Sequence, residues 1–357
     1  MAGRNTIPHE RFILQTRWKL LLLALGLAGL WYLAATAAMT PDELRQWERV
    51  RAAQLHLSQW RQGSGGTVDA AEDRWNCGLI GMEWSSISTT LGDPSAKRTA
   101  CNPAWAVSLS RWFIDLGLKP GDPIAIYSSG SFPGFLLSVL VAAEAMELKP
   151  LLIVSLGSSS WGANDPAAPW PVLAAELRHK GFIRTPADYY TLGAGAELGQ
   201  GLSPEGEALL RSAAQEAGVE LLTAPGLAEM IFRKTDLMVQ HQSRLLVSIG
   251  GSQANLGDGL EILKVKPGLI HPDDYSNAGN GVIATALQAG LPVIHMLNVK
   301  ALSEISGIPY DSRPRKVAPV KVNVGLSLAG IIIFFIILWR HKRWRLDKSV
   351  GNLRPDG

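Results

Sequence analysis

The residues best suited to chemistry in this sequence are small hydroxyl and glycine residues that follow three apolar runs. They form the segments SSGSFPG (128–134), SLGSSSWGAN (155–164) and SIGGSQANLGDG (248–259). Such residues let backbone N–H groups face outward, and ligands of open α/β sheets bind at the carboxyl ends of the strands. The three segments therefore predict one ligand site at strand ends, with tight strand-to-helix turns as the structural alternative.

Ser131 is the residue for which a catalytic and a structural role compete most directly. The nucleophile elbow of α/β-hydrolases has the pattern G-x-S-x-G. Here Gly130 directly precedes Ser131 and Gly134 follows it by three places, so that pattern is not met. Pro133 would stand in the first turn of a helix over 132–146, which favours Ser131 as the N-cap of that helix. A ligand-binding hydroxyl and a nucleophile stay open as alternatives.

A serine nucleophile needs a base, and His271 is the best placed of the seven histidines. It lies in LIHPDDY (269–275), two residues before Asp273. A histidine oriented by a carboxylate is the arrangement that serine hydrolases use. The catalytic candidates are therefore Ser131, His271 and Asp273, with a solvated polar loop as the alternative.

A further polar segment lies upstream and is suited to holding an anion. It runs from Glu83 to Lys97 and is rich in serine and threonine. Lys97 can pair with a substrate carboxylate while hydroxyl groups complete the hydrogen bonds of that carboxylate; a solvated loop is the alternative. The full set of expected ligand-binding residues is Glu83, Thr89, Lys97, Ser129, Gly130, Ser131, Ser158, Asn164, Gly250 and Gly251.

Cys77 and Cys101 are the two cysteines, and neither has a second ligand at C-x-x-C or C-x-x-H spacing. A metal site is therefore not expected. A disulfide between them and two separate buried thiols both fit the sequence. The sequence contains no Walker A motif, so ATP-dependent ligation is not expected and no cofactor is implied.

Strands and helices alternate around these segments. Strands are expected at 124–127, 151–155, 245–249 and 293–297, and helices at 40–62, 103–116, 132–146, 171–180, 205–217 and 279–289. Short apolar strands that alternate with helices are typical of a parallel sheet covered on both faces. The predicted fold class is therefore α/β, an open, mostly parallel, doubly wound sheet.

Two uncharged stretches, residues 20–38 and 322–339, bound this region, and basic residues flank both. At about 1.5 Å per residue the first stretch would form a helix roughly 28 Å long, close to the thickness of a hydrocarbon core. They predict a transmembrane helix at each end of the chain, with a cleaved signal peptide as the alternative for the first. Basic residues concentrate in 1–19 and 340–357, so both termini are expected in the cytoplasm.

The expected layout has six parts. They are a basic cytoplasmic N-terminus (1–19), a transmembrane helix (20–38), a helical stalk (39–66), an extracytoplasmic α/β domain (67–321), a second transmembrane helix (322–339) and a basic cytoplasmic tail (340–357). The two end segments hold ten basic and three acidic residues, which leaves 24 basic and 28 acidic residues between them. The part between them is thus mildly acidic, and nucleic acid is not an expected partner.

Four segments together resemble the poly-gamma-glutamate system protein family. They are GMEWSSISTTLGDPSAKRTACNP (81–103), SSGSFPG (128–134), SLGSSSWGANDP (155–166) and SIGGSQANLG (248–257). The resemblance covers most of residues 75–310, and the matching positions are Glu83, Thr89, Thr90, Lys97, Ser131, Trp161, Asn164, Gly250 and Gly251. It carries over no catalytic residue.

The resemblance implies a membrane-associated accessory protein of poly-gamma-glutamate capsule synthesis or export in bacteria. Its expected place is the cytoplasmic membrane. Its expected partners are the poly-gamma-glutamate synthase membrane complex, the anionic γ-glutamyl polymer and the lipid bilayer. Such a protein would bind the polymer or scaffold the synthase. The alternative is an extracytoplasmic serine-dependent hydrolase or transpeptidase that processes the polymer.

Overall fold

The computed structural model divides the chain into two units, Met39–Pro319 and the two chain ends, Met1–Ala38 with Val320–Gly357. It describes residues 21, 23–27, 39–63, 69–274, 277–319, 328, 330–337 and 339. The expected spans 20–38 and 322–339 extend beyond the described residues, and the expected segments 1–19 and 340–357 lie wholly outside them. Residues 23–27 and 330–337 are helical. Within the described parts of the chain, no helix combines the length and the apolar character that crossing a membrane requires.

The unit Met39–Pro319 is built on one seven-stranded sheet with the order β4-β3-β2-β1-β5-β7-β6. Its strands are β1 Pro123–Ser129, β2 Lys149–Ser155, β3 Tyr189–Thr191, β4 Glu220–Leu221, β5 Leu246–Ile249, β6 Gly268–Ile270 and β7 Val293–Met296. Neighbouring strands are parallel except for β6 and β7, which are antiparallel. The four expected strands are β1, β2, β5 and β7, and they form the continuous centre of the sheet. The predicted α/β fold with a mostly parallel sheet is confirmed.

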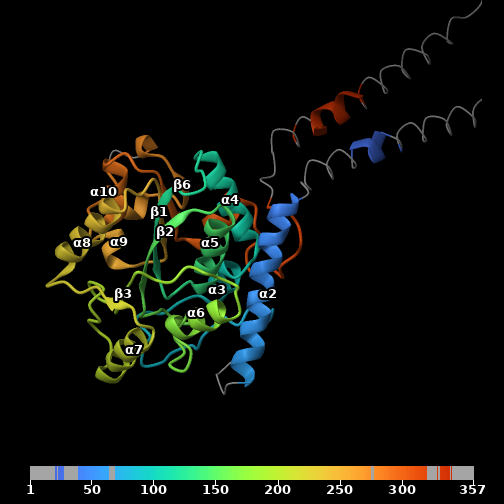
Figure 1. Ribbon diagram of the computed structural model, residues 1–357. Helices are drawn as coiled ribbons and strands as arrows, with labels where there is room; N and C mark the ends of the chain where they lie inside the picture. The colour runs from blue at the N-terminus through green and yellow to red at the C-terminus, as the bar shows by residue number, and fades with distance from the viewer. Residues whose placement is uncertain are drawn as a thin grey trace, which may run out of the picture. The chain divides into compact units, whose positions relative to one another are not determined.

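Helices connect the strands and cover the sheet (Figure 1). Their bounds are α2 Pro41–Gly63, α3 Pro94–Ala100, α4 Ala104–Asp115, α5 Pro133–Ala145, α6 Trp170–His179, α7 Pro204–Glu216, α8 Leu227–Gln240, α9 Gln253–Leu256, α10 Val282–Gln288 and α11 Val299–Ser306. Two short 3₁₀ turns span Glu261–Lys264 and Pro272–Asp274. The six helices that the sequence predicts correspond to α2, α4, α5, α6, α7 and α10.

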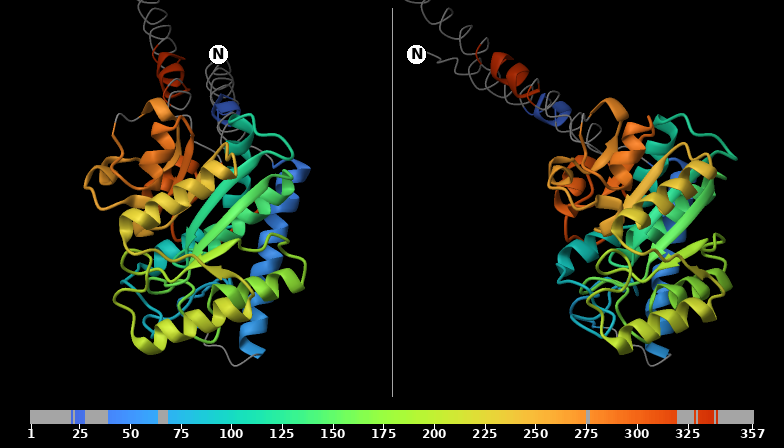
Figure 2. Two further views of the ribbon diagram at one scale, coloured as in Figure 1. Left: turned by 60° about the vertical axis from the view of Figure 1, so that its left-hand side comes forward. Right: turned by 90° about the vertical axis from the view of Figure 1, so that its left-hand side faces the viewer.

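Strand β1 is buried on both of its faces. Its side chains alternate between two hydrophobic cores: Ile124 and Ile126 belong to the core that includes α2, α4, α5 and α6, whereas Ala125 and Tyr127 belong to the core that includes α8 and α10. The views in Figures 1 and 2 show these two groups of helices on opposite sides of the sheet. A parallel strand buried in this way must be apolar at nearly every position, which explains why the strand could be recognised as an apolar run.

Helix α2, which falls in the segment expected to be a stalk, packs along the first of these cores. Trp47, Val50 and Leu57 on this helix are buried. In its last turn the buried Arg61 donates to a carboxylate oxygen of Asp165 at 2.8 Å. The helix is therefore an integral part of the unit Met39–Pro319.

The segment that follows α11 is fastened to α3. The guanidinium of Arg98 donates to both carboxylate oxygens of Asp311, at 2.6 and 2.8 Å. The backbone N–H of Asp311 donates to Thr99 Oγ1 at 2.8 Å, and the hydroxyl of Tyr310 donates to Asp93 Oδ2 at 2.6 Å. Residues 213 positions apart in the sequence are thereby held together.

The direction of the chain across the sheet reverses at β1. Strands β2, β3 and β4 follow one another on one side of β1, whereas β5 lies on the other side. The register aligns Ser129 with Ser155 and Ser128 with Ile249, so the carboxyl ends of β1, β2 and β5 lie level. At such a switch point the loops after the two central strands diverge and leave a crevice, which is where open α/β sheets bind ligands.

Candidate functional site

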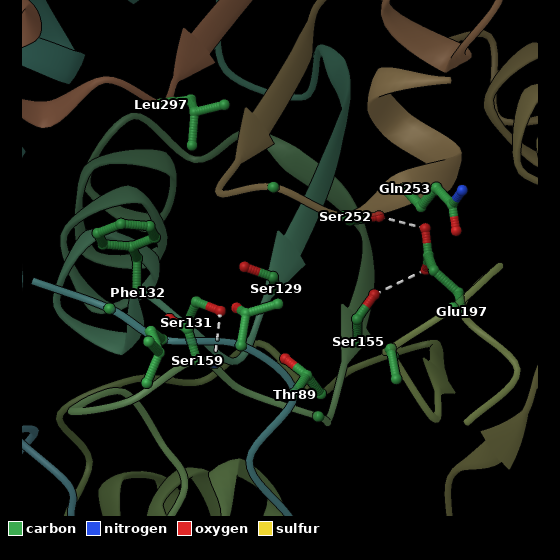
Figure 3. Close-up of a pocket in the computed structure, with 18 of the residues that line it drawn as sticks. Thr89, Ser129, Ser131, Phe132, Ser155, Ser159, Glu197, Ser252, Gln253 and Leu297 are labelled. Atoms are coloured by element: carbon green, nitrogen blue, oxygen red, sulfur yellow. Dashed lines mark hydrogen bonds between the residues drawn. The ribbon is translucent and has the colours of Figure 1, made fainter. Parts of the chain in front are cut away.

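A cavity of about 480 Å³ lies at the carboxyl ends of β1, β2 and β5 (Figure 3). The three loops that the sequence predicts to share a site all contribute to its walls. The residues that they supply are Ser129, Ser131, Phe132, Ser155, Gly157, Ser159, Gly251, Ser252 and Gln253. The structure therefore brings the three loops together around one cavity at the topological switch point.

Two further segments complete the walls. The first lies between residues 89 and 97, before β1, and includes Thr89 and Lys97. The second lies between residues 193 and 200, in a glycine-rich loop after β3, and includes Glu197. In Figure 3 the side chains of Ser131 and Ser159 lie toward one end of the cavity, and that of Glu197 lies toward the other. The cavity thus has two chemically distinct ends.

The expected ligand-binding residues divide evenly between the cavity and its surroundings. Those that line the cavity are Thr89, Lys97, Ser129, Ser131 and Gly251. Those outside its walls are Glu83, Gly130, Ser158, Asn164 and Gly250. Among the latter, Glu83 is exposed.

Asn164 and Ser158 are buried and hold the surrounding loops in place. The side-chain amide of Asn164 accepts from the backbone N–H of Met82 at 2.9 Å and donates to the Met82 carbonyl and to Ser88 Oγ. The hydroxyl of Ser158 donates to the carbonyl oxygen of Gly130 at 3.1 Å. These internal hydrogen bonds account for both side chains, which have no further group to offer to the cavity.

Ser131 is not the N-cap that the sequence favours. Helix α5 begins at Pro133, its N-cap residue is Phe132, and no side chain caps it. The hydroxyl of Ser131 instead accepts a hydrogen bond from the backbone N–H of Ser159 at 3.0 Å (Figure 3). The interpretation as a cap is wrong because this side chain connects the loop after β1 to the loop after β2.

His271 and Asp273 lie at the amino ends of the central strands, whereas Ser131 lies at their carboxyl ends. His271 directly follows β6, and β6 runs antiparallel to β7, so Ile270 pairs with Val293 at the start of β7. The backbone N–H of His271 donates to its neighbour Asp274 at 2.7 Å. The hypothesis of a Ser131–His271 catalytic pair is therefore wrong, because the sequence pattern does not reveal the direction of a short edge strand.

The two cysteines lie outside the cavity walls. Cys77 and Cys101 are both buried and both carry free thiols. Burial, together with the neighbouring side chain of Cys101, raises the pKa of the Cys77 thiol. Of the two possibilities that the sequence leaves open, the structure shows the pair of buried thiols.

Lys97 is a buried lysine at the end of the cavity that holds Ser131 and Ser159. Its side chain is 3% exposed. The Nζ atom donates to the carbonyl oxygen of Ser131 at 2.6 Å and to Ser159 Oγ at 2.7 Å, and it lies 3.8 Å from the centre of the Phe132 ring. Across the described ranges of the chain it forms no ion pair. Burial lowers the pKa of Lys97 to about 7, so the amine changes its charge near neutral pH.

Glu197, at the other end, carries a compensated charge. Its carboxylate accepts from Lys234 Nζ at 2.9 and 3.2 Å, from Ser155 Oγ at 2.7 Å, from Thr191 Oγ1 at 2.8 Å, and from the hydroxyl of Ser252. Burial opposes ionisation, but Lys234 and the hydroxyl donors outweigh it, so the pKa of Glu197 lies below its usual value. The backbone of Glu197 is left-handed, with φ of +62°. Its role is to tie together the loops after β2, β3 and β5.

Several donors in the crevice between β1 and β5 have no acceptor among the described residues. The hydroxyl of Ser129 is buried and has no partner. The backbone N–H groups of Ser131, Gly251 and Ser252 also donate no hydrogen bond within the described part of the chain. Gly250 makes this packing possible, because its φ is +77° and a Cβ atom there would lie 2.1 Å from Ser129 Oγ. A ligand with several acceptor atoms, such as a carboxylate, would satisfy these donors.

Ser155, Ser159, Ser252, Glu197 and Lys234 are the site residues that sequence reasoning missed. Ser155, Ser159 and Ser252 lie inside two of the segments that the sequence singles out. The sequence therefore predicted the loops that form the site but not which of their serines line it. Glu197 lies in LGAGAELGQG (192–201), whose glycine content resembles that of the other three loops. Lys234 lies in the middle of α8, and nothing in its neighbourhood in the sequence marks it.

No family model matches this chain, and no curated protein and no solved structure is significantly similar to it. The interpretation of the cavity therefore depends on its own residues. They offer hydroxyl groups, free backbone N–H groups and one lysine that titrates near neutral pH, which suits the binding of an anionic group and acid–base chemistry.

Proposed function

We propose that this cavity binds a carboxylate of the γ-glutamyl polymer, and that the protein is a membrane-anchored accessory of poly-gamma-glutamate synthesis or export. The observation that carries the proposal is the set of unsatisfied donors between β1 and β5, namely the hydroxyl of Ser129 and the N–H groups of Ser131, Gly251 and Ser252. Ser129 and Ser252 are buried, and buried donors in folded proteins nearly always have acceptors. A carboxylate supplies two oxygens with about four lone-pair sites and fits this requirement.

The charges around the cavity are compatible with an anion. Lys97 contributes a positive charge in its protonated form. The charge of Glu197 is compensated by Lys234 at 2.9 Å. The remaining carboxylate in the walls, that of Asp93, is exposed and accepts from Ser95 N and Tyr310 Oη, so solvent and these donors attenuate its repulsion.

The size of the cavity favours a short part of a polymer. A volume of about 480 Å³ lies within the range of roughly 300–1,000 Å³ that is typical of small-ligand sites. A chain end or a short run of γ-glutamyl residues is therefore the expected occupant. The remainder of a long polymer would extend into solvent or toward the synthase.

The membrane anchoring and the synthase partner belong to the same proposal and have their support in the sequence. The uncharged stretches 20–38 and 322–339, with their basic flanks, support anchoring at both ends of the chain. The four segments that resemble the poly-gamma-glutamate system protein family support the partner, and all four contribute residues to the walls just described.

Binding of a short γ-linked glutamate oligomer to the full-length protein in detergent tests this function. We expect the anionic oligomer to bind and a γ-linked glutamine oligomer of the same length to bind much more weakly. Ser129→Ala removes an unpaired donor and should weaken binding about fivefold, which corresponds to about 1 kcal/mol. Ser128→Ala is the matched control, because Ser128 is its buried neighbour on β1 and its hydroxyl donates to the Ser129 carbonyl. Equal binding of the neutral and anionic oligomers would refute the proposal.

A further inference from the structure

The arrangement of Ser159 and Lys97 goes beyond what binding alone requires. We propose that Ser159 Oγ is a nucleophile and Lys97 Nζ its general base, and that this dyad cleaves or transfers a γ-glutamyl amide bond held in the cavity. The choice of substrate rests on the function proposed above, whereas the dyad itself rests on the geometry of the two side chains. Serine–lysine pairs are an established alternative to the serine–histidine arrangement.

The two reacting atoms lie within hydrogen-bond distance. Lys97 Nζ is 2.7 Å from Ser159 Oγ, and both residues line the cavity. The carbonyl oxygen of Ser131 accepts from the same Nζ atom at 2.6 Å and fixes its position. A nucleophile, a base in contact with it and a third group that orients the base constitute the signature of an activated nucleophile.

The surroundings of Lys97 favour a neutral amine, as a base must be. The side chain is buried against the face of Phe132 and forms no ion pair within the described residues. Asp93 and Cys101, at the two ends of α3, favour the charged form, but burial outweighs them and sets the pKa of Lys97 at about 7. Glu197, in the opposite wall, is compensated by Lys234. A base with a pKa near the working pH is the most effective one.

Ser159 is also held in place, and it is the only one of the cavity serines that the base contacts through its hydroxyl. Its backbone N–H donates to Ser131 Oγ at 3.0 Å (Figure 3), and its hydroxyl oxygen accepts a hydrogen bond from Lys97 Nζ. Lys97 contacts Ser131 through the carbonyl and not through the hydroxyl. Gly92 packs against the pair, since a Cβ atom there would lie 3.1 Å from Ser159 Oγ and 3.2 Å from Lys97 Cε.

Apart from the substrate, the reaction requires only water or an amine. Ser159 Oγ transfers its proton to neutral Lys97 Nζ and bonds to the amide carbonyl carbon. The C–N bond then breaks, and the departing nitrogen takes the proton from Lys97, which leaves a γ-glutamyl ester on Ser159. Water, after losing a proton to Lys97, attacks the ester and gives a carboxylic acid, and Ser159 recovers its proton; an amine in place of water gives transfer. The unpaired N–H of Ser131 is a donor available to the negative charge that develops on the carbonyl oxygen.

Two readouts on the full-length protein in detergent test the dyad. The first is the appearance of shortened chains from a γ-linked glutamate oligomer, followed by mass spectrometry. Ser159→Ala and Lys97→Met should each lower this turnover by at least about 100-fold, while Ser160→Ala, at the neighbouring buried serine, should leave it within about twofold. Ser159→Ala should bind the oligomer within about threefold of the wild type.

The second readout is covalent labelling by a fluorophosphonate, which needs an activated serine but no polymer. We expect a single adduct on Ser159, and its rate should rise with pH through about 7 as Lys97 loses its proton. Oligomer affinity should change in the opposite direction, because protonated Lys97 favours an anion. Thermal unfolding of each variant shows whether the fold is retained.

The possible outcomes distinguish a failure of the proposed dyad from a failure of the proposed polymer-binding function. Labelling of Ser159 that Lys97→Met abolishes, without any oligomer binding, would support the dyad and refute the function proposed above. Oligomer binding with neither labelling nor turnover would refute the dyad and leave the binding function intact. Turnover that survives Ser159→Ala would also refute the dyad.

Discussion

Two buried lysines lie beside the cavity, and they differ in the partners of their amino groups. Lys234, 1% exposed, donates to the carboxylate of Glu197 and to Asn255 Oδ1 at 2.6 Å. Lys97, 3% exposed, contacts two neutral oxygens, the Ser131 carbonyl and the Ser159 hydroxyl. Lys234 is therefore an internal counter-ion of Glu197, whereas Lys97 is a buried amine that can be either neutral or protonated near pH 7.

The difference separates a structural role from a chemical one. Burial lowers the pKa of Lys234, but the carboxylate of Glu197 opposes this shift, so the pair serves as an internal ion pair that fixes the loops in place. A buried amine with neutral partners gives up its proton near the working pH, and such groups concentrate at functional sites. The residues around Glu197 therefore hold the walls together, and the residues around Lys97 are available for chemistry.

The largest effect on stability is expected at the structural lysine. Glu197→Ala leaves Lys234 buried without its carboxylate, which should lower the free energy of unfolding by about 3–5 kcal/mol. Urea unfolding of the full-length protein in detergent, followed by tryptophan fluorescence, measures this change. Glu207→Ala is the matched control, because Glu207 pairs with Arg211 on the surface of α7, where such pairs are worth under about 1 kcal/mol. A loss at Glu197 no larger than that of the control would refute the structural assignment.

A smaller effect, with a characteristic pH dependence, is expected at the chemical lysine. The folded protein binds fewer protons at Lys97 than the unfolded chain between pH about 7 and the usual lysine pKa of about 10.4, so stability should rise with pH in that window. Relative to Lys97→Met, the wild type should gain about 2 kcal/mol in unfolding free energy between pH 7 and pH 9. Lys149→Met, at an exposed lysine on β2, controls for the loss of a positive charge. A flat difference over this range would mean that Lys97 stays charged.

The smallest effect sharpens the comparison within the Glu197 network. Thr191→Val keeps the shape of the side chain but removes a hydroxyl that donates to Glu197 at 2.8 Å, and should cost about 1.5 kcal/mol in unfolding free energy. Thr235→Val is the matched control. Its hydroxyl oxygen is buried without a partner among the described residues, so its loss should be neutral or stabilising. Equal costs for the two variants would show that the hydrogen bond to Glu197 contributes nothing specific.

The centre of the sheet could be predicted from the sequence, and its edges could not. Strands β1, β2, β5 and β7 each have a neighbouring strand on both sides. Their burial requires apolar residues at most positions, and the resulting apolar run is visible in the sequence. Strands β3, β4 and β6 are two or three residues long. A run that short carries no periodicity, and the antiparallel direction of β6 depends on its pairing with β7.

The candidate site shows the same limit. The loops after the visible strands were found, and Ser129, Ser131 and Gly251 in them do line the cavity. Glu197 was missed because it follows β3, a strand that the sequence does not reveal. Lys97 was expected to meet a carboxylate on the strength of its charge. Its contact with Ser159 depends on the packing of α3 against the loop after β2, which no local pattern encodes.

The hydrogen bonds between Arg98 and Asp311 have a consequence for the order in which the contacts of the protein can form during its synthesis. Helix α3 carries Lys97, and Asp311, which accepts two hydrogen bonds from the guanidinium of Arg98 on that helix, lies 213 positions later in the chain. A ribosome has therefore synthesised β1, β2 and β5 long before Asp311 exists. Nascent chains can build the sheet and the contacts of Lys97 with Ser131 and Ser159 early, but the two hydrogen bonds between Arg98 and Asp311 form only after residue 311 has emerged.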